Sequence, residues 1–144
     1  MSFPLSKPRF TTDAPDPAAL GADISALPDL DPRFQIQTGT RVLAEALVRR
    51  LQTSRGTLSG TPAYGDDIRQ QLNGAMTQQT LFEIKTGIER ECLSDSRVLT
   101  AAASLDWSAA TETLTIGITA TSADGPFRLV LAVSALTIAI LAAQ

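Results

Sequence analysis

Histidine is absent from the 144-residue chain, and cysteine occurs once, as Cys92. Without histidine the chain lacks the commonest general base and the usual serine and cysteine triads. A zinc site of the ordinary kind needs a set of cysteine and histidine ligands, which this composition cannot supply. A single cysteine cannot form an internal disulfide bond. We therefore expect no metal ion and no cofactor.

Basic runs and long apolar helices are also missing. Twelve lysines and arginines stand against fifteen acidic residues, and no basic cluster of the kind that binds nucleic acid is present. The uncharged stretch 129–144 has 16 residues, which is short of the roughly 20 that a membrane-spanning helix needs. Its β-branched residues favour strands, and residues 1–10 do not look like a secretory signal. We expect neither nucleic acid nor a membrane as partner.

The remaining composition is typical of a folded domain with an arm. Apolar residues make up 44% of the chain and charged residues 19%. Residues 1–35 hold six of the eight prolines and show no helical or strand period. They indicate an extended arm, because proline fixes φ and removes a hydrogen-bond donor. This arm is either disordered or orders only along a neighbour. One domain is expected over residues 36–144.

An amphipathic helix is expected over residues 38–54, where leucine recurs at every fourth position. Thr38 or Thr40 can cap its N-terminus, and Gly56 supplies a stop. Polar and charged side chains fall mostly on the opposite side. The apolar stripe predicts that this helix packs against a core.

Residues 55–67 form a glycine-rich segment that we expect to be a structured loop, because Leu58 and Tyr64 give it side chains to bury. Asp66 and Asp67 then stand where acidic residues favour a helix N-terminus. A second, short helix is expected after them.

A third helix is expected from about Thr77. Its apolar residues fall on one face: Leu81, Ile84, Ile88 and Cys92. On that face Cys92 is expected to act as a small hydrophobe rather than as a reactive thiol. The glutamates of this helix are expected mainly off the apolar face: Glu83, Glu89 and Glu91.

After Asp95 the apolar period drops to two, which predicts strands. Three strands and a fourth C-terminal element are expected, with an Asp-Gly hairpin signal at 124–125. The inward side chains of the first strand should be Leu99, Ala101, Ala103, Leu105 and Trp107. The order of arm, helices and then meander predicts an α+β fold with about three helices on one face of a small antiparallel sheet.

Paired carboxylates are the one catalytic arrangement that the composition leaves open. Glu83, Glu91, Asp95 and Asp106 can be nominated for glycan hydrolysis, but solvated helix faces and turns account for them. The glycines of residues 55–67 match no phosphate-binding loop. We expect the protein not to be an enzyme.

Two segments in this order resemble the baseplate wedge and sheath-initiator family of contractile phage tails and related injection machines. The glycine-rich segment before the short helix matches the family pattern at Arg55, Gly56, Pro62, Tyr64, Gly65 and Ile68. Residues 95–98, DSRV, stand where the family has Glu-Pro-Arg and an apolar residue. Asp95 keeps the charge on a shorter side chain, and Ser96 loosens the φ that proline fixes. The resemblance runs from about Asp31 to the C-terminus.

The resemblance implies a structural role in the baseplate of a virion tail, made in the cytoplasm of the bacterial host. It implies contacts with wedge proteins and sheath protein, with tail-tube or hub proteins as further possible partners, and six copies per baseplate. The first sheath ring would add to an open sheet edge by β-augmentation. Some family members carry a lysozyme label, which the residues above give no reason to follow. The alternatives are an adaptor unrelated to tails and a cell-wall glycan hydrolase.

The residues expected to contact partners are Tyr64, Asp95, Arg97, Leu136, Ile138 and Ile140. Asp95 and Arg97 occupy alternate positions at a strand start, so their side chains project to the same side. Two interpretations stay open for them. They either pair with each other and fasten helix to sheet, or Arg97 meets a carboxylate or a helix C-terminus of a wedge protein.

Overall fold

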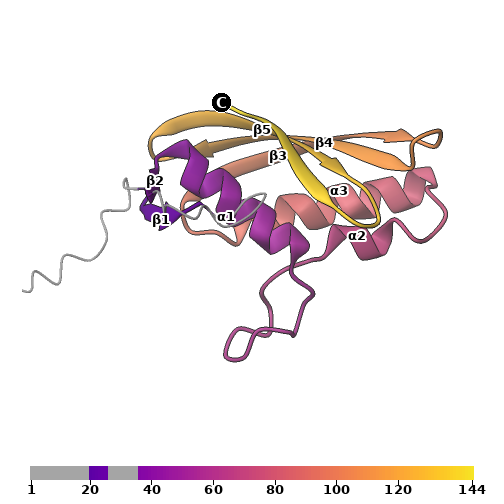
Figure 1. Cartoon of the computed structure of the whole chain (residues 1–144), viewed down its shortest axis with the longest axis horizontal. Coiled ribbons are helices and arrows are strands. Elements are labelled where there is room, and N and C mark those ends of the chain that lie inside the picture. The colour runs from indigo at the N-terminus through magenta and orange to yellow at the C-terminus, as the bar shows by residue number, and fades with distance from the viewer. Residues whose placement is uncertain (1–19, 26–35) are drawn as a thin grey trace, which may run out of the picture.

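The structure is a computed structural model that describes residues 20–25 and 36–144. Over these residues, three helices lie on one face of a four-stranded antiparallel sheet, with a small two-stranded sheet beside them (Figure 1). This confirms the expected α+β class. The rest of the predicted arm, residues 1–19 and 26–35, lies outside the described residues.

Helix α1, Thr40–Gln52, carries the expected apolar stripe. Its buried apolar side chains are Val42, Leu43, Ala44, Leu47, Val48 and Leu51. Gly39 precedes the first turn with a φ of 68°, and no side chain caps the helix, so the expected threonine caps at Thr38 and Thr40 are wrong. The positive φ favours glycine at this position. The helix ends before the expected stop at Gly56, because the backbone is already extended at Thr53.

Helices α2, Ile68–Gln71, and α3, Gln78–Leu93, both begin at side-chain caps. The side chain of Asp67 accepts a first-turn N–H of α2, and Thr77 does the same for α3. Each cap satisfies one of the donors that a helix N-terminus leaves unpaired. Both helix starts agree with the sequence prediction.

The buried face of α3 includes Cys92, as expected. Burial raises the pKa of its thiol to about 12, so the thiolate is not formed near neutral pH. Glu91 differs from expectation, because it is 2% exposed although the periodicity placed it off the apolar face. Ion pairing with arginines from outside the helix explains the burial.

The large sheet is an antiparallel meander with the strand order β3-β4-β5-β6. Its strands are β3 Val98–Ser108, β4 Thr113–Ser122, β5 Gly125–Val133 and β6 Ile138–Ala143. Ser122 pairs with Gly125 across the β4–β5 turn, which confirms the Asp-Gly hairpin signal. Strand β6 confirms the fourth element expected at the C-terminus.

A β-bulge at the start of β3 changes which side chain is buried. The register against β4 shifts between Val98 and Thr100. Val98 is therefore buried, whereas Leu99 is 62% exposed. The expectation that Leu99 faces inward is wrong, since a bulge inserts one residue into the period-two alternation.

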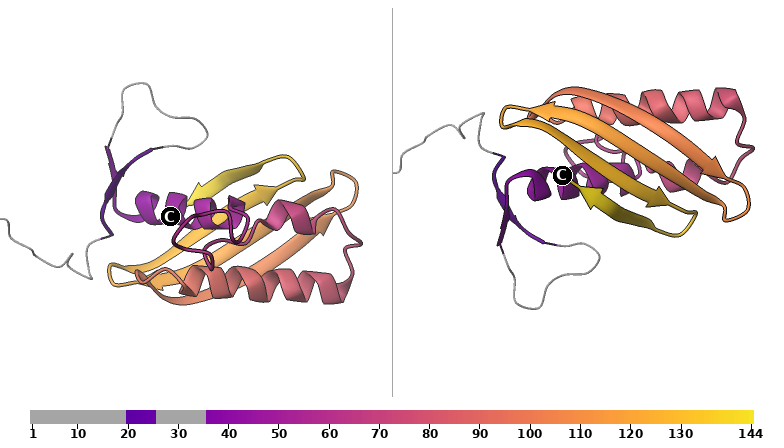
Figure 2. Two further views of the ribbon diagram at one scale, coloured as in Figure 1. Left: turned by 90° about the horizontal axis from the view of Figure 1, so that it is seen from below. Right: turned by 90° about the horizontal axis from the view of Figure 1, so that it is seen from above.

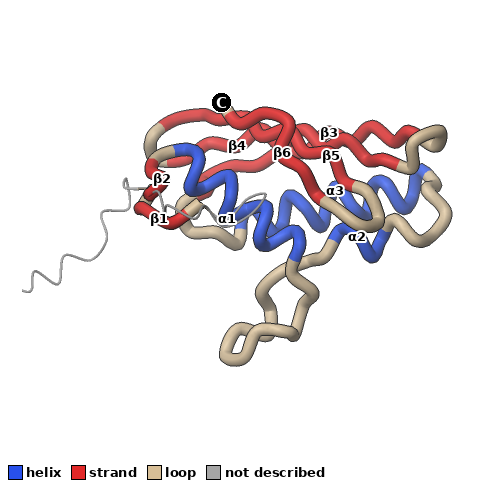
Figure 3. Tube along the Cα trace, in the orientation of Figure 1, coloured by secondary structure: helices blue, strands red, loops and turns tan. Residues whose placement is uncertain are grey.

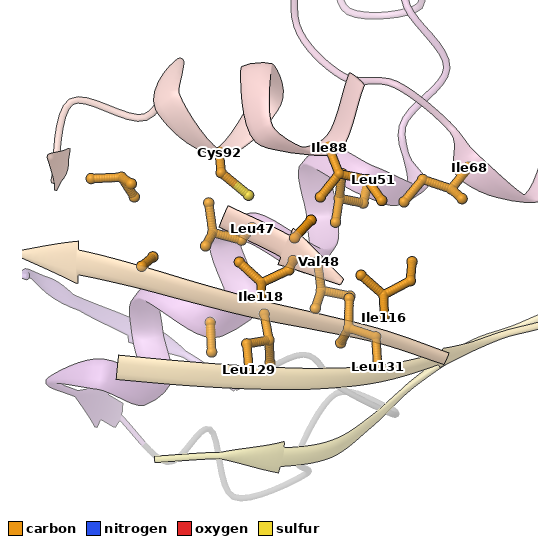
Figure 4. Close-up of a cluster of buried hydrophobic side chains, with 14 of the residues drawn as sticks. Leu47, Val48, Leu51, Ile68, Ile88, Cys92, Ile116, Ile118, Leu129 and Leu131 are labelled. Atoms are coloured by element: carbon orange, nitrogen blue, oxygen red, sulfur yellow. The ribbon is translucent and has the colours of Figure 1, made fainter. Parts of the chain in front are cut away.

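The core lies between the helices and the inner face of the sheet. Figure 4 shows side chains of α1, α2 and α3 meeting those of β4 and β5 there: Leu47, Val48, Leu51, Ile68, Ile88, Cys92, Ile116, Ile118, Leu129 and Leu131. Burying each leucine or isoleucine contributes roughly 1.5–3 kcal/mol. This contact between the layers is the main source of stability.

Part of the predicted arm belongs to the packed domain. Strand β1, Ala22–Ile24, pairs antiparallel with β2, Ile36–Thr38. Leu20 is 4% exposed and joins the core. The sequence did not indicate this because both strands are short and most of their residues are exposed.

The second face of the large sheet carries no helix in the described residues (Figure 2, right). Its side chains are mostly small or polar: Ala102, Ser104, Thr115, Gly117, Thr119, Val130 and Ala132. No helix in the described part of the chain has the length and apolar character needed to cross a bilayer. The loop between α1 and α2, residues 53–67, projects on the side away from the sheet (Figure 3).

Gly65 tests how tightly the end of this loop is packed. Its φ is 91°, and a Cβ there would lie 2.3 Å from the carbonyl oxygen of Thr53. Gly65→Ala should lower the free energy of unfolding by about 2–4 kcal/mol, because backbone strain and a clash add. Gly60→Ala is the matched control, since Gly60 has a φ of 84° with open space around it, and it should cost about 1 kcal/mol. Urea unfolding measures both, and equal losses would contradict the packing.

Candidate partner-binding site

Asp95 and Arg97 form a bidentate ion pair at the junction of α3 and β3. Arg97 Nε donates to Asp95 Oδ1 at 2.9 Å, and Arg97 Nη2 donates to Oδ2 at 2.7 Å. The backbone N–H of Arg97 also donates to Asp95 Oδ1, at 3.1 Å. A bidentate pair fixes the mutual orientation of both groups, so these side chains face each other.

Arg97 also holds the N-terminal segment. Its Nη1 donates to the carbonyl oxygen of Leu20 at 3.0 Å. In the same segment, Asp23 pairs with Arg49 of α1 at 2.7 Å. These contacts fix residues 20–25 against the domain. The internal pair is thus present in the structure, and a contact of Arg97 with a wedge protein stays a prediction.

A second pair has the same spacing and geometry. Arg69 Nε and Nη2 donate to the two carboxylate oxygens of Asp67, each at 2.8 Å. Arg69 Nη2 also donates to the carbonyl oxygen of Gln52, at the end of α1, at 3.0 Å. In both places the tripeptide Asp-x-Arg forms a local pair whose guanidinium holds a remote carbonyl. The sequence analysis singled out only the pair at Asp95.

Both aspartates have a lowered pKa. At Asp67 the hydrogen bond from Arg69 is the largest cause. At Asp95 burial would raise the pKa, but the side-chain and backbone hydrogen bonds from Arg97 and its charge together outweigh it. Each carboxylate is therefore more stable as the anion in the folded chain than in the unfolded chain.

Tyr64 lies at the base of the 53–67 loop, with Arg50 over its ring. The Cζ atom of Arg50 is 4.4 Å from the ring centroid, a cation–π contact. Arg50 Nη2 also donates to the carbonyl oxygen of Ser94, the residue before Asp95, at 3.4 Å. The structure therefore brings Tyr64 near the Asp95–Arg97 pair, with one face of its ring engaged inside the domain.

Glu91 ties the loop to α3. Its side chain is 3% exposed, and Arg55 Nη2 donates to its Oε1. Arg50 Nη1 lies 3.7 Å from its Oε2, which has no hydrogen-bond partner in the described residues. Two arginines balance the charge of one buried carboxylate, which offsets its cost of desolvation. Arg55, one of the residues that match the family pattern, thus anchors the loop.

The tip of the loop is exposed. Residues 57–63 all lie at the surface, and Leu58 is 44% exposed. The expectation that Leu58 is buried is wrong, because the loop is held at its base and not by its tip. Tyr64 is half-buried, as expected.

The three C-terminal candidates lie on β6 and the turn before it. Leu136 is 84% exposed in that turn. Ile138 and Ile140 are half-buried and pack against the core. The side chains of Ile138 and Ile140 are therefore used in packing within the domain. A partner would contact the backbone groups of these two residues.

The backbone of β6 has a free side. Strand β6 ends the strand order, so within residues 20–25 and 36–144 it pairs with β5 alone. The N–H of Ser134 donates to the carbonyl oxygen of Thr137 at 2.9 Å. Hydrogen-bonded and non-hydrogen-bonded pairs alternate along antiparallel strands, so the N–H and C=O groups of Ile138 and Ile140 point away from β5. They form an open edge beside Leu136.

The six candidates thus fall into two groups. Tyr64, Asp95 and Arg97 lie around the junction that leads into β3, and the C-terminal three lie along β6. Strands β3 and β6 are opposite edges of the sheet. The side chains of the first group are engaged within the domain. The second group presents backbone groups that have no partner among the residues the structure describes.

The carboxylates considered for hydrolysis have separate surroundings. Glu91 and Asp95 each pair with arginine. Glu83 is exposed and accepts a hydrogen bond from Gln79. Asp106 is exposed in an open groove of about 680 Å³ between α3 and β3. In residues 20–25 and 36–144, no three His, Cys, Asp or Glu side chains cluster as metal ligands would.

Glu89 has a structural contact that the sequence analysis missed. Its Oε1 accepts the backbone N–H of Ala103 in β3 at 2.9 Å. Such a contact joins segments that are remote in sequence, so helical periodicity alone gives no signal for it. The sequence gives one indirect indication of this contact, which is that a helix with several glutamates precedes the first strand of the sheet.

Comparison with known proteins adds no relative. No model of a known protein family matches the chain, and no curated protein shows significant similarity to it.

Acid titration tests the Asp95–Arg97 pair. Since the folded pKa of Asp95 is lowered, the pair stabilises the fold above the unfolded value of about 4. That stability is lost as the pH falls below about 4 and through the folded pKa. Asp95→Asn should therefore flatten the fall of unfolding free energy between about pH 5 and pH 2. Asp124→Asn, in an exposed turn, is the control. A wild-type slope in Asp95→Asn would contradict the pairing.

Hydrogen exchange tests what each arginine holds. Arg97→Ala should speed amide exchange in residues 20–25 about tenfold or more, since a lost charged hydrogen bond is worth roughly 1.5–3 kcal/mol. Arg69→Ala removes the equivalent clamp on Gln52 and should leave residues 20–25 unchanged. The same increase in both variants would indicate general loosening and refute the specific clamp.

Proposed function

We propose that this protein is a structural component of a contractile tail baseplate, which joins wedge proteins and nucleates sheath polymerisation. The step we assign to it is strand addition: a strand of the first sheath ring hydrogen-bonds along β6. The open edge at Ile138 and Ile140 is the observation that carries this proposal. The resemblance of residues 55–68 and 95–98 to the sheath-initiator family supplies the biological setting.

The composition of β6 supports this role. Exposed edge strands usually carry lysine, proline or another feature that prevents pairing with other chains. Strand β6, Ile138–Ala143, has neither a charged residue nor proline. Next to its backbone groups, Leu136 and Leu141 are 84% and 60% exposed. An edge of this kind is a liability in a free protein and is suited to permanent coverage in an assembly.

The remainder of the domain supports the edge. Core contacts hold Ile138 and Ile140 from the inner face, so the strand is already formed before a partner arrives. A preformed strand reduces the entropy that association must offset. Wedge contacts are assigned to the region of Tyr64, Asp95 and Arg97 on the strength of the family resemblance. Tail-tube or hub contacts are compatible with the same setting.

Deletion of the gene tests the role in the particle. Electron microscopy of the resulting particles should show tubes without sheath or no tails, and the restored gene should rescue sheathed tails. Normal sheathed tails without the gene would refute the proposal and leave the adaptor or the hydrolase to be tested.

A matched pair of leucines tests the edge itself. Leu141→Lys on β6 should strongly reduce the fraction of sheathed tails, because a charged side chain at an edge disfavours strand addition. Leu99→Lys is the control, since Leu99 is 62% exposed, sits at a bulge as Leu141 does, and belongs to the opposite edge strand. Both variants should fold, as circular dichroism would verify. Equal sheath assembly in both would count against β6 as the site.

A further inference from the structure

The two edges of the large sheet are built differently. Strand β3 lies beside α3, which packs against it and flanks that edge (Figure 2). Ala103 stands opposite Ile118 of β4, yet its N–H donates to Glu89 of α3 at 2.9 Å. This N–H therefore faces outward from the sheet, and a carboxylate occupies the place that the carbonyl oxygen of an added strand would take.

Helix α1 packs near β6, so the two edges do not differ in having a helix beside them. They differ in the contacts made to the strand backbone. Among the described residues, no side chain hydrogen-bonds to the backbone of β6, Ile138–Ala143. Its outward N–H and C=O groups therefore have no partner in the described part of the chain, in contrast to the donor at Ala103. Among the described residues, the β3 edge thus has a side-chain contact to its outward backbone near its middle, at Ala103, and the β6 edge has none.

We propose that Glu89 closes the β3 edge to strand addition, so that the sheet accepts a neighbouring strand at β6 alone. An added strand at β3 would have to displace a charge-assisted hydrogen bond. It would also bring the negative ends of its own carbonyl dipoles toward the carboxylate, which is unfavourable. This inference deepens the proposed function, because it leaves the sheath strand one place to add. It rests on the proposed function for the identity of that strand.

A single open edge also limits self-association. A chain with one open edge can pair once with a second copy, edge to edge, and then has none left. A chain with two open edges can add copies at both sides and form an open-ended assembly. The occupant of the β3 edge, once it is opened, is thus a second copy of this chain.

Sedimentation of the purified full chain tests this. Wild type should not exceed the mass of a dimer at any concentration. Glu89→Ala should show a weight-average mass that rises past the dimer as concentration increases. Glu89→Gln keeps an acceptor oxygen and should behave as wild type. Glu83→Ala, on an exposed position of the same helix, is the control and should also behave as wild type.

Amide hydrogen exchange locates the change. At low concentration the Ala103 N–H should exchange about tenfold or more faster in Glu89→Ala than in wild type, because a charged hydrogen bond is lost. At high concentration it should regain protection as copies add there. Glu89→Leu keeps the bulk of the side chain without an acceptor and gives the same expectation if the alanine variant does not fold.

Several results would overturn the inference. The first is that the Ala103 N–H exchanges no faster in Glu89→Ala and Glu89→Leu than in wild type. The second is that this N–H exchanges faster but the mass stays at the wild-type value. The third is that Glu83→Ala polymerises as much as Glu89→Ala. The experiment uses the chain alone, so its failure leaves sheath nucleation untouched. Conversely, normal sheathed tails after gene deletion would refute the proposed function and not the closure of the β3 edge.

Discussion

The apolar contact between the helices and one face of the meander is the constraint on which the rest of the structure depends. Leucines of α1 and isoleucines of α3 are completely buried against β4 and β5. Because the helices cover a single face and the meander does not close into a barrel, the sheet keeps a second face and two edges. Helix α3 packs against β3, where Glu89 reaches the edge, and α1 packs near β6, where no described side chain hydrogen-bonds to the strand backbone. The packing of α3 against β3 is therefore what brings Glu89 to the backbone of that edge.

Charged side chains then fasten the peripheral segments to this core. The Asp95–Arg97 pair holds the segment at Leu20, its counterpart at Asp67 holds the end of α1, and buried Glu91 holds the glycine-rich loop. In each of the three attachments an arginine forms an ion pair with the carboxylate, so the buried carboxylate is not left without a counter-charge. Three of the motif residues, Arg55, Asp95 and Arg97, take part in these attachments. Partner contacts at this end would have to use the surface around them.

Local periodicity predicted much of the fold, and contacts between remote residues account for what it missed. The helix starts after Asp67 and near Thr77, the buried Cys92 and the Asp-Gly hairpin all depend on neighbours in sequence, and all were predicted. The exposure of Leu99 depends on a bulge against β4, and the burial of Glu91 depends on arginines from α1 and the loop. For the site, the C-terminal strand was predicted from composition. The direction of its backbone groups and the cover at Glu89 needed the register of the sheet.

The central claim is that a neighbouring strand adds to β6. A reconstruction of the assembled baseplate at a resolution that shows main-chain density tests it most directly. The account predicts a strand of sheath protein hydrogen-bonded to the outward groups of Ile138 and Ile140, with the Glu89 contact to Ala103 intact. A β6 edge that faces solvent in the finished particle, or an added strand along β3, would contradict it.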